Sequence, residues 1–286
     1  MARRILLLAC LSTGAALAPR TRQALPGIQR RRAAVPDLVT TRGECRLFLD
    51  TADRNEWRNL LSLGIFYGIT TNPTLLEKAT VPCTLPSIAN LADEAFSFGI
   101  EEFMVQSWGD SAETLLENGL LLNELDPDRV VVKVPVTPAG TRAAVALIDE
   151  GVRVCLTASY AREQALIAGA IGAEYIAPYL GRMTDAGKDG VEECEAMQSI
   201  VDGVGAGTRI LVASIRQPSD LSTLAAQGLD TFTFSPKIAR SLFAESLTTK
   251  AAESFERAAA RGGAYETAID PLGEDLFVNG IEDEDF

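Results

Sequence analysis

Lys133 stands in the run VVVKVPV (residues 130–136), and no acidic residue lies beside it in the sequence. The β-branched valines predict a strand buried on both faces, where an ammonium group is costly unless something pairs or uses it. One use is chemical, because a desolvated amine loses its proton more readily than one in water and can attack a ketone to form a Schiff base. The protonated imine then acts as an electron sink for breaking or making a carbon–carbon bond. The alternative is a structural lysine paired with a buried acid, for which Asp50 is the candidate; we favour the chemical interpretation.

Polar residues also stand at the ends of the other strand-like segments. Arg182 and Arg216 follow neighbouring segments, and Ser214 lies two residues before the second arginine. Two guanidinium groups with one hydroxyl match a phosphate monoester, whereas a lone arginine more often pairs with surface acids. The full set of strand-end candidates is Asp50, Thr70, Thr71, Asn72, Gln106, Lys133, Thr157, Tyr179, Arg182, Ser214, Arg216, Ser235 and Lys237.

Composition limits which groups can move protons. The 286-residue chain contains no histidine, which excludes Ser-His-Asp triads, Cys-His dyads and HExxH zinc sites. Proton transfer therefore falls to Asp, Glu, Lys, Tyr, Cys or water. The five cysteines form no CxxC pair, so we expect reduced thiols and no metal site.

Charge is distributed unevenly along the chain. Residues 1–36 hold seven arginines and no acid, whereas the remainder holds 19 basic and 39 acidic residues. A folded part this acidic argues against general nucleic-acid binding, which needs a basic face. Local basic groups can still bind the phosphate of a small substrate in such a protein.

Residues 1–40 have the pattern of a cleaved targeting leader. Two arginines, a short apolar run and small residues up to Ala18 resemble a signal peptide, and the arginine-rich, acid-free segment that follows resembles a transit peptide. The two in series resemble the bipartite leader of a protein bound for a complex algal plastid, which is the expected location. A single mitochondrial or secretory presequence is the alternative. No other stretch is apolar enough for a transmembrane helix, so we expect no membrane association of the mature form.

From residue 46 onward, strand-like and helix-like segments alternate. Gly residues stand where several helices are predicted to end, and no GxGxxG or GxxxxGK[ST] motif of a nucleotide-binding open sheet is present. Eight such pairs predict an α/β fold, a (β/α)8 TIM barrel over residues 46–262, with the doubly wound open sheet as the alternative. An extra C-terminal helix is expected around 248–261 and an acidic tail over 263–286. The predicted strands are 47–50, 65–71, 102–108, 130–135, 152–158, 175–180, 210–214 and 231–235.

Alternation along the fourth strand predicts where Lys133 points. Val131, Lys133 and Pro135 share one face, and the remaining three valines share the other. The all-valine face suits the helix layer, so we expect Lys133 to point into the barrel. The carboxyl ends of the strands form the active site in such barrels.

Six spaced motifs together resemble the transaldolase family, most closely its small fructose-6-phosphate aldolase and transaldolase-like branch. The motifs are LFLDTAD (47–53), GITTNPTLL (68–76), VVVKVPVTPAG (130–140), LTASY (156–160), AEYIAPYLGRM (173–183) and LVASIRQP (211–218). The resemblance implies a class I aldolase on a (β/α)8 barrel that needs no metal or cofactor, acts on a phosphorylated sugar and forms a homo-oligomer in which the terminal helix reaches a neighbour.

The resemblance also implies roles for individual residues. Lys133 matches the Schiff-base lysine, and Thr157 matches the threonine that binds a catalytic water. Asp50 and Asn72, with Thr71 before the latter, match the residues that hold the substrate hydroxyls and assist proton transfer. The phosphate clamp matches Arg182, Ser214 and Arg216.

Four positions distinguish the two branches of this family. Classical transaldolases carry a glutamate, an asparagine and Ser-Pro-Phe where this chain has Gln106, Cys155 and Ala177-Pro178-Tyr179. Gln106 and Tyr179 resemble the aldolase branch, whereas Cys155 matches neither. Because an amide cannot take a proton, the phenol of Tyr179 is the expected acid/base group. We expect fructose 6-phosphate aldolase activity; transaldolase activity with erythrose 4-phosphate and a non-catalytic sugar-phosphate-binding barrel are the alternatives.

Overall fold

The computed structural model of the chain describes residues 44–264. The leader predicted over residues 1–40, and the acidic tail beyond residue 264, lie outside this part and stay predictions. None of the helices within residues 44–264 is long and apolar enough to cross a membrane.

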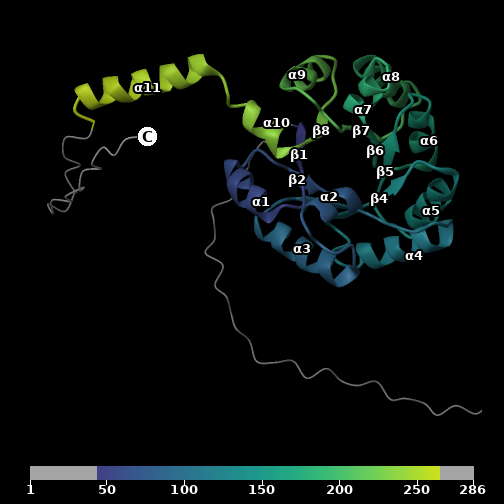
Figure 1. The fold of residues 1–286 in the computed structure, drawn as a ribbon. Helices are drawn as coiled ribbons and strands as arrows, with labels where there is room; N and C mark the ends of the chain where they lie inside the picture. The colour runs from purple at the N-terminus through teal and green to yellow at the C-terminus, as the bar shows by residue number, and fades with distance from the viewer. Residues whose placement is uncertain (1–43, 265–286) are drawn as a thin grey trace, which may run out of the picture. The chain divides into compact units, whose positions relative to one another are not determined.

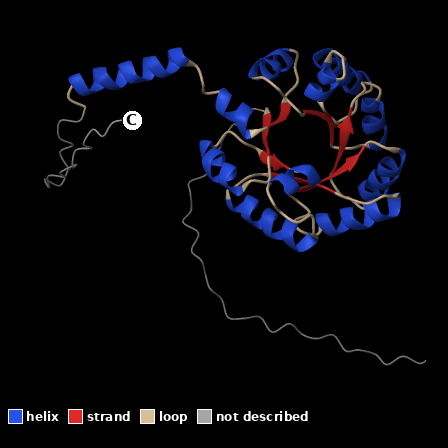
Figure 2. Ribbon diagram, in the orientation of Figure 1, coloured by secondary structure: helices blue, strands red, loops and turns tan. Residues whose placement is uncertain are grey.

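Eight parallel strands close into a barrel, as the alternation predicts (Figures 1 and 2). Each strand pairs with the next, and β8 pairs with β1, so the open-sheet alternative is wrong. The second strand is shorter than expected, because Ile65 and Phe66 precede it in a loop. The strands are β1 Arg46–Asp50, β2 Gly68–Thr70, β3 Glu102–Gln106, β4 Val130–Pro135, β5 Val154–Ser159, β6 Tyr175–Pro178, β7 Arg209–Val212 and β8 Thr231–Phe234.

Helices surround the strands in a ring (Figure 2). Short helices that the sequence analysis did not separate, α2, α7 and α10, begin directly after β2, β6 and β8 and therefore border the carboxyl ends of the strands. The helices are α1 Arg54–Leu60, α2 Pro73–Lys78, α3 Leu85–Ser97, α4 Ala112–Asn123, α5 Pro138–Asp149, α6 Gln164–Ile171, α7 Leu180–Asp185, α8 Gly190–Gly203, α9 Pro218–Ala226, α10 Pro236–Ser241 and α11 Ser246–Arg261, with a 3-10 turn, η1, at Leu61–Leu63.

The apolar residues of β4 divide between two cores. Val130, Val132 and Val134 pack in the layer between strands and helices, whereas Val131 packs inside the barrel. The interior cluster consists of Phe48, Met104, Val131, Cys155, Tyr175, Ala177 and Leu211. This division confirms that the face of β4 carrying Lys133 is the inner one.

The amino-terminal end of the barrel contains a buried carboxylate whose charge is compensated by arginines and a hydroxyl. Glu102, 1% exposed, forms ion pairs with Arg46 and Arg153 and accepts a 2.8 Å hydrogen bond from the hydroxyl of Tyr175. Burial of a charge is costly unless partners surround it, and here two guanidinium groups and a phenol do so. The opposite, carboxyl end of the barrel holds the candidate site.

Candidate active site

Lys133 lies near the carboxyl end of β4 and is 3% exposed. Its Nζ donates a 3.1 Å hydrogen bond to the backbone carbonyl of Thr71. Among residues 44–264 no carboxylate forms an ion pair with Lys133, and Asp50 instead accepts a 2.7 Å hydrogen bond from the hydroxyl of Thr70. The alternative of a lysine paired with a buried Asp50 is therefore wrong.

The two residues level with Lys133 on the neighbouring strands are uncharged. Gln106 on β3 and Cys155 on β5 pair with Lys133 in the sheet register, so their side chains share its inward face. Burial raises the pKa of the Cys155 thiol to about 12, and the nearby Lys133 opposes this shift without cancelling it. The thiol is thus protonated at neutral pH, so neither residue that pairs with Lys133 in the sheet supplies a negative charge to hold an ammonium.

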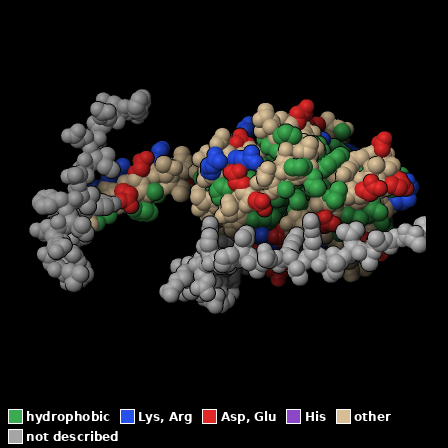
Figure 3. Space-filling view, turned by 90° about the horizontal axis from the view of Figure 1, so that it is seen from below, with side chains coloured by type: hydrophobic (Ala, Val, Ile, Leu, Met, Phe, Trp, Pro, Cys, Tyr) green, Lys and Arg blue, Asp and Glu red, His purple; other side chains and the backbone are tan. Residues whose placement is uncertain are grey.

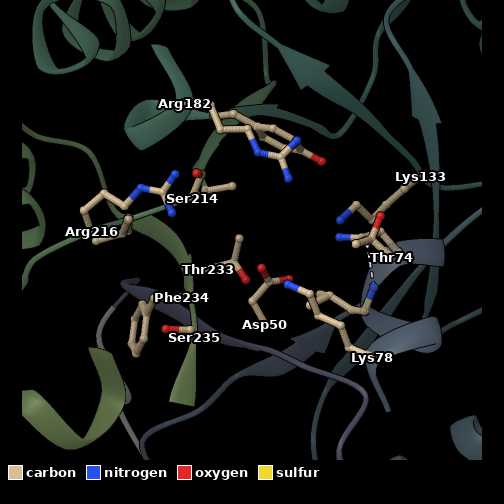
Figure 4. A pocket seen from close by; sticks show the side chains of 15 residues that line it. Asp50, Thr74, Lys78, Lys133, Arg182, Ser214, Arg216, Thr233, Phe234 and Ser235 are labelled. Atoms are coloured by element: carbon tan, nitrogen blue, oxygen red, sulfur yellow. Dashed lines mark hydrogen bonds between the residues drawn. The ribbon is translucent and has the colours of Figure 1, made fainter. Parts of the chain in front are cut away.

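A pocket of about 220 Å³ opens above the amine (Figure 4). It gathers residues from β1, β4 and β8 and from the segments that follow β2, β6 and β7, which lie far apart in the sequence. In the described part of the chain, no three His, Cys, Asp or Glu residues are grouped so as to hold a metal ion. The lining residues are Asp50, Asn72, Thr74, Leu75, Lys78, Lys133, Tyr179, Arg182, Ala213, Ser214, Ile215, Arg216, Thr233, Phe234 and Ser235.

The structure brings two candidate proton carriers together. The hydroxyl of Thr157, fully buried on β5, lies 3.2 Å from the hydroxyl of Tyr179, which follows β6. Tyr179 lines the pocket, whereas Thr157 lies behind it. The two hydroxyls are within hydrogen-bond distance, and either of them can be the donor.

The three predicted clamp residues line the same pocket. Arg182 stands over the ring of Tyr179, with 4.9 Å from its guanidinium carbon to the ring centre, and donates a 3.3 Å hydrogen bond to the hydroxyl of Tyr160. This bond is the main cause of a raised pKa of Arg182, so its charge is secure. Ser214 has a φ of +60°, a left-handed conformation that is uncommon for serine and that often marks functional loops. Figure 4 shows both arginines and Ser214 on one side of the pocket.

Asn72 and Thr71 differ in whether their side chains face the pocket. Asn72 lines the pocket, and its side-chain oxygen caps α2 by accepting a 3.0 Å hydrogen bond from the amide of Leu75. Thr71 is fully buried, and its hydroxyl donates to the carbonyl of Met104 at 3.0 Å. The structure therefore does not bring the Thr71 side chain into the pocket; its backbone carbonyl holds Lys133 instead.

Comparison with known proteins identifies the family. The model of the family described as "Transaldolase/Fructose-6-phosphate aldolase" matches residues 47–285. The chain belongs to this family. A "Probable transaldolase" of Leptospira biflexa is 34% identical over 209 residues, covering 73% of this chain and 95% of the relative. Another, of Aquifex aeolicus, is 34% identical over 212 residues, covering 73% and 94%. A third, of Rhodospirillum centenum, is 35% identical over 211 residues, covering 73% and 89%.

Membership in the transaldolase family makes the chain an enzyme with an aldolase or transferase activity toward phosphorylated sugars. The pocket fits such a substrate in outline, since it carries a buried amine within it and two guanidinium groups at one side. A keto sugar phosphate has a carbonyl that suits the amine and a phosphate that suits the guanidinium groups.

Sequence reasoning missed three polar residues that line the pocket. Thr74 and Lys78 stand one helical turn apart on α2, and Lys78 is exposed at the pocket wall. Thr233 lies within β8, and its hydroxyl is 2.5 Å from that of Thr70. The alternation TFTF could have indicated an inward Thr233, whereas nothing in the sequence shows that α2 turns Lys78 toward the pocket.

Proposed function

We propose that this chain is a class I aldolase that cleaves fructose 6-phosphate into dihydroxyacetone and glyceraldehyde 3-phosphate, or forms it from them, through an imine on Lys133. The observation that carries the proposal is the buried Nζ of Lys133, which lines the pocket and has a backbone carbonyl as its hydrogen-bond partner. A desolvated amine that is not tied to a carboxylate is the nucleophile that Schiff-base chemistry requires.

The bond changes follow from this amine. The nitrogen of Lys133 adds to the ketone carbon C2, and loss of water leaves a protonated imine. A base removes the proton of the C4 hydroxyl, the C3–C4 bond breaks, and its electron pair moves to the imine nitrogen to give an enamine. Glyceraldehyde 3-phosphate leaves, the enamine is protonated at C3, and water returns to C2 to release dihydroxyacetone and the free amine.

Tyr179 is the proposed proton carrier for these steps. Its hydroxyl lies 3.2 Å from Thr157 and its side chain lines the pocket, whereas the residue level with Lys133 on β3 is the amide Gln106, which cannot accept a proton. Asp50 and Asn72 also line the pocket and are proposed to supply oxygen and amide groups for the sugar hydroxyls. Arg182, Ser214 and Arg216 are the proposed phosphate clamp.

One alternative has specific support. The curated relatives bear the name transaldolase, which favours a transferase that passes the dihydroxyacetone unit to erythrose 4-phosphate. Gln106 and Tyr179 favour the aldolase, and both activities share the imine. Family membership argues against the non-catalytic sugar-phosphate-binding barrel, which would form no covalent intermediate.

The first test traps the imine. Borohydride added with fructose 6-phosphate should reduce it to a stable adduct on Lys133, located by peptide mass spectrometry. Lys133→Arg should carry no adduct and no turnover while its circular dichroism is unchanged, because arginine keeps the charge but is not a nucleophile at this pH. Lys250→Arg, the same change on α11, should label normally. An adduct on another lysine, or none at all, contradicts the proposal.

The second test separates the two enzyme activities. Fructose 6-phosphate alone should yield free dihydroxyacetone if water protonates and releases the enamine. Addition of erythrose 4-phosphate should then change the products little. If dihydroxyacetone never accumulates and turnover depends on erythrose 4-phosphate, the chain is a transaldolase.

The third test concerns the proton carrier. Tyr179→Phe removes one hydroxyl and keeps the ring under Arg182, so we expect kcat to fall by about 10²-fold with little change in KM. Single-turnover cleavage of fructose 6-phosphate measures the effect. A loss below about threefold would assign the proton transfer to water held by Thr157.

We also propose a homo-oligomer in a plastid. In α11 no residue is buried, and Leu247 and Phe255 are 72% and 70% exposed, which suits a helix that packs on another copy. Figure 3 shows further hydrophobic side chains exposed among charged ones.

Sedimentation of the chain lacking residues 1–40 should show an assembly of more than one copy. A fluorescent protein fused to residues 1–40 should enter the plastid.

A further inference from the structure

The short helix α7 touches both arginines of the proposed clamp. It carries Arg182 itself, and its last residue, Asp185, accepts a 2.6 Å hydrogen bond from Nη2 of Arg216. This contact is the single ion pair that Arg216 makes within residues 44–264. Arg216 lines the active-site pocket and also a neighbouring hollow of about 590 Å³ that Asp185 lines as well. The guanidinium group thus stands between the two spaces.

The stem of Arg216 lies directly against the backbone of α7. A Cβ atom added to Gly181 would lie 2.7 Å from both Cγ and Nε of Arg216, and 2.3 Å from the carbonyl oxygen of Ser214. The amide of Gly181 donates a 3.0 Å hydrogen bond to that same carbonyl. The helix therefore fixes the clamp loop at its backbone, along the arginine stem and, through Asp185, at the guanidinium.

We infer that Asp185 is a positioning residue for the phosphate clamp, an inference that rests on the proposed function. Asp185 takes one nitrogen of the Arg216 guanidinium, so Nε and Nη1 keep their donors for a phosphate in the pocket. A planar guanidinium recognises phosphate well only when its N–H donors point at the phosphate oxygens. An arginine side chain that is already held on one side loses less conformational entropy when the phosphate binds. Arg216 and Asp185 are more than half exposed, so the pair matters for orientation more than for the stability of the fold.

If Asp185 instead competed with the substrate for Arg216, its removal would change KM in the opposite direction. If its carboxylate competed with the substrate for Arg216, removing the charge would strengthen phosphate binding. If it positions Arg216, removing the hydrogen bond weakens binding, and an amide that keeps the acceptor oxygen preserves much of it. The two roles therefore differ in the sign of the change in KM.

The experiment compares Asp185→Ala with Asp185→Asn. We expect Asp185→Ala to raise KM for fructose 6-phosphate by about tenfold, with kcat and the KM for unphosphorylated fructose little changed. Asp185→Asn should stay within about threefold of the parent, because its side-chain oxygen can still accept from Nη2. Competition by inorganic phosphate should weaken in the same order. Glu192→Ala is the matched control, since Glu192 is 64% exposed against 62% for Asp185 and is also paired with an arginine.

Arg216→Ala distinguishes failure of this inference from failure of the proposed function. If Arg216→Ala raises KM for phosphorylated donors and Asp185→Ala does not, the positioning role is wrong and the clamp stands. A lower KM in both Asp185 variants also overturns the positioning role, in favour of competition. If Arg216→Ala itself has equal effects on phosphorylated and unphosphorylated donors, or if Lys133 forms no adduct, the proposed function fails.

Discussion

The site depends on one amine that the barrel buries, and no carboxylate among residues 44–264 forms an ion pair with it. The Nζ of Lys133 has a carbonyl 3.1 Å away, and the residues level with it, Gln106 and Cys155, are an amide and a protonated thiol. Burying an amine is costly unless a polar partner receives its hydrogen bond, and the carbonyl of Thr71 is that partner here. The apolar interior below Lys133 therefore fixes where the amine lies as well as contributing to the fold.

The two ends of the barrel differ in whether a buried ionisable group has ion-pair partners. At the amino-terminal end, Glu102 receives two arginines and a tyrosine hydroxyl, so its charge is compensated inside the protein. At the carboxyl end, Asp50 accepts a hydrogen bond from the hydroxyl of Thr70, and no carboxylate among residues 44–264 forms an ion pair with Lys133. The buried acid is thus compensated by charge at one end, and the buried amine has only a carbonyl partner at the end where loops and short helices can shape a pocket around it.

The sequence predicted those features that depend on a short repeat along one element. The alternation in β4 sufficed to place Lys133 inside the barrel, because one face is all valine and packs against helices. Features that depend on how loops fold were not predictable. Thr71 stands at a strand end as expected, yet its hydroxyl bonds to Met104, and Lys78 reaches the pocket because α2 begins directly after β2. The pairing of Arg216 with Asp185 joins the loop after β7 to the end of α7, and no sequence pattern relates the two.

The proposed phosphate clamp and the proposed proton carrier meet at a single side chain. Tyr179 lies under the guanidinium of Arg182 at 4.9 Å, makes an edge contact with Tyr160 at 5.5 Å and reaches Thr157 through its hydroxyl. Arg182 in turn donates a hydrogen bond to the hydroxyl of Tyr160, so the three side chains hold one another in place. A phosphate that engaged Arg182 would therefore bind beside the ring proposed to move the proton, and the two proposed roles depend on the same packing.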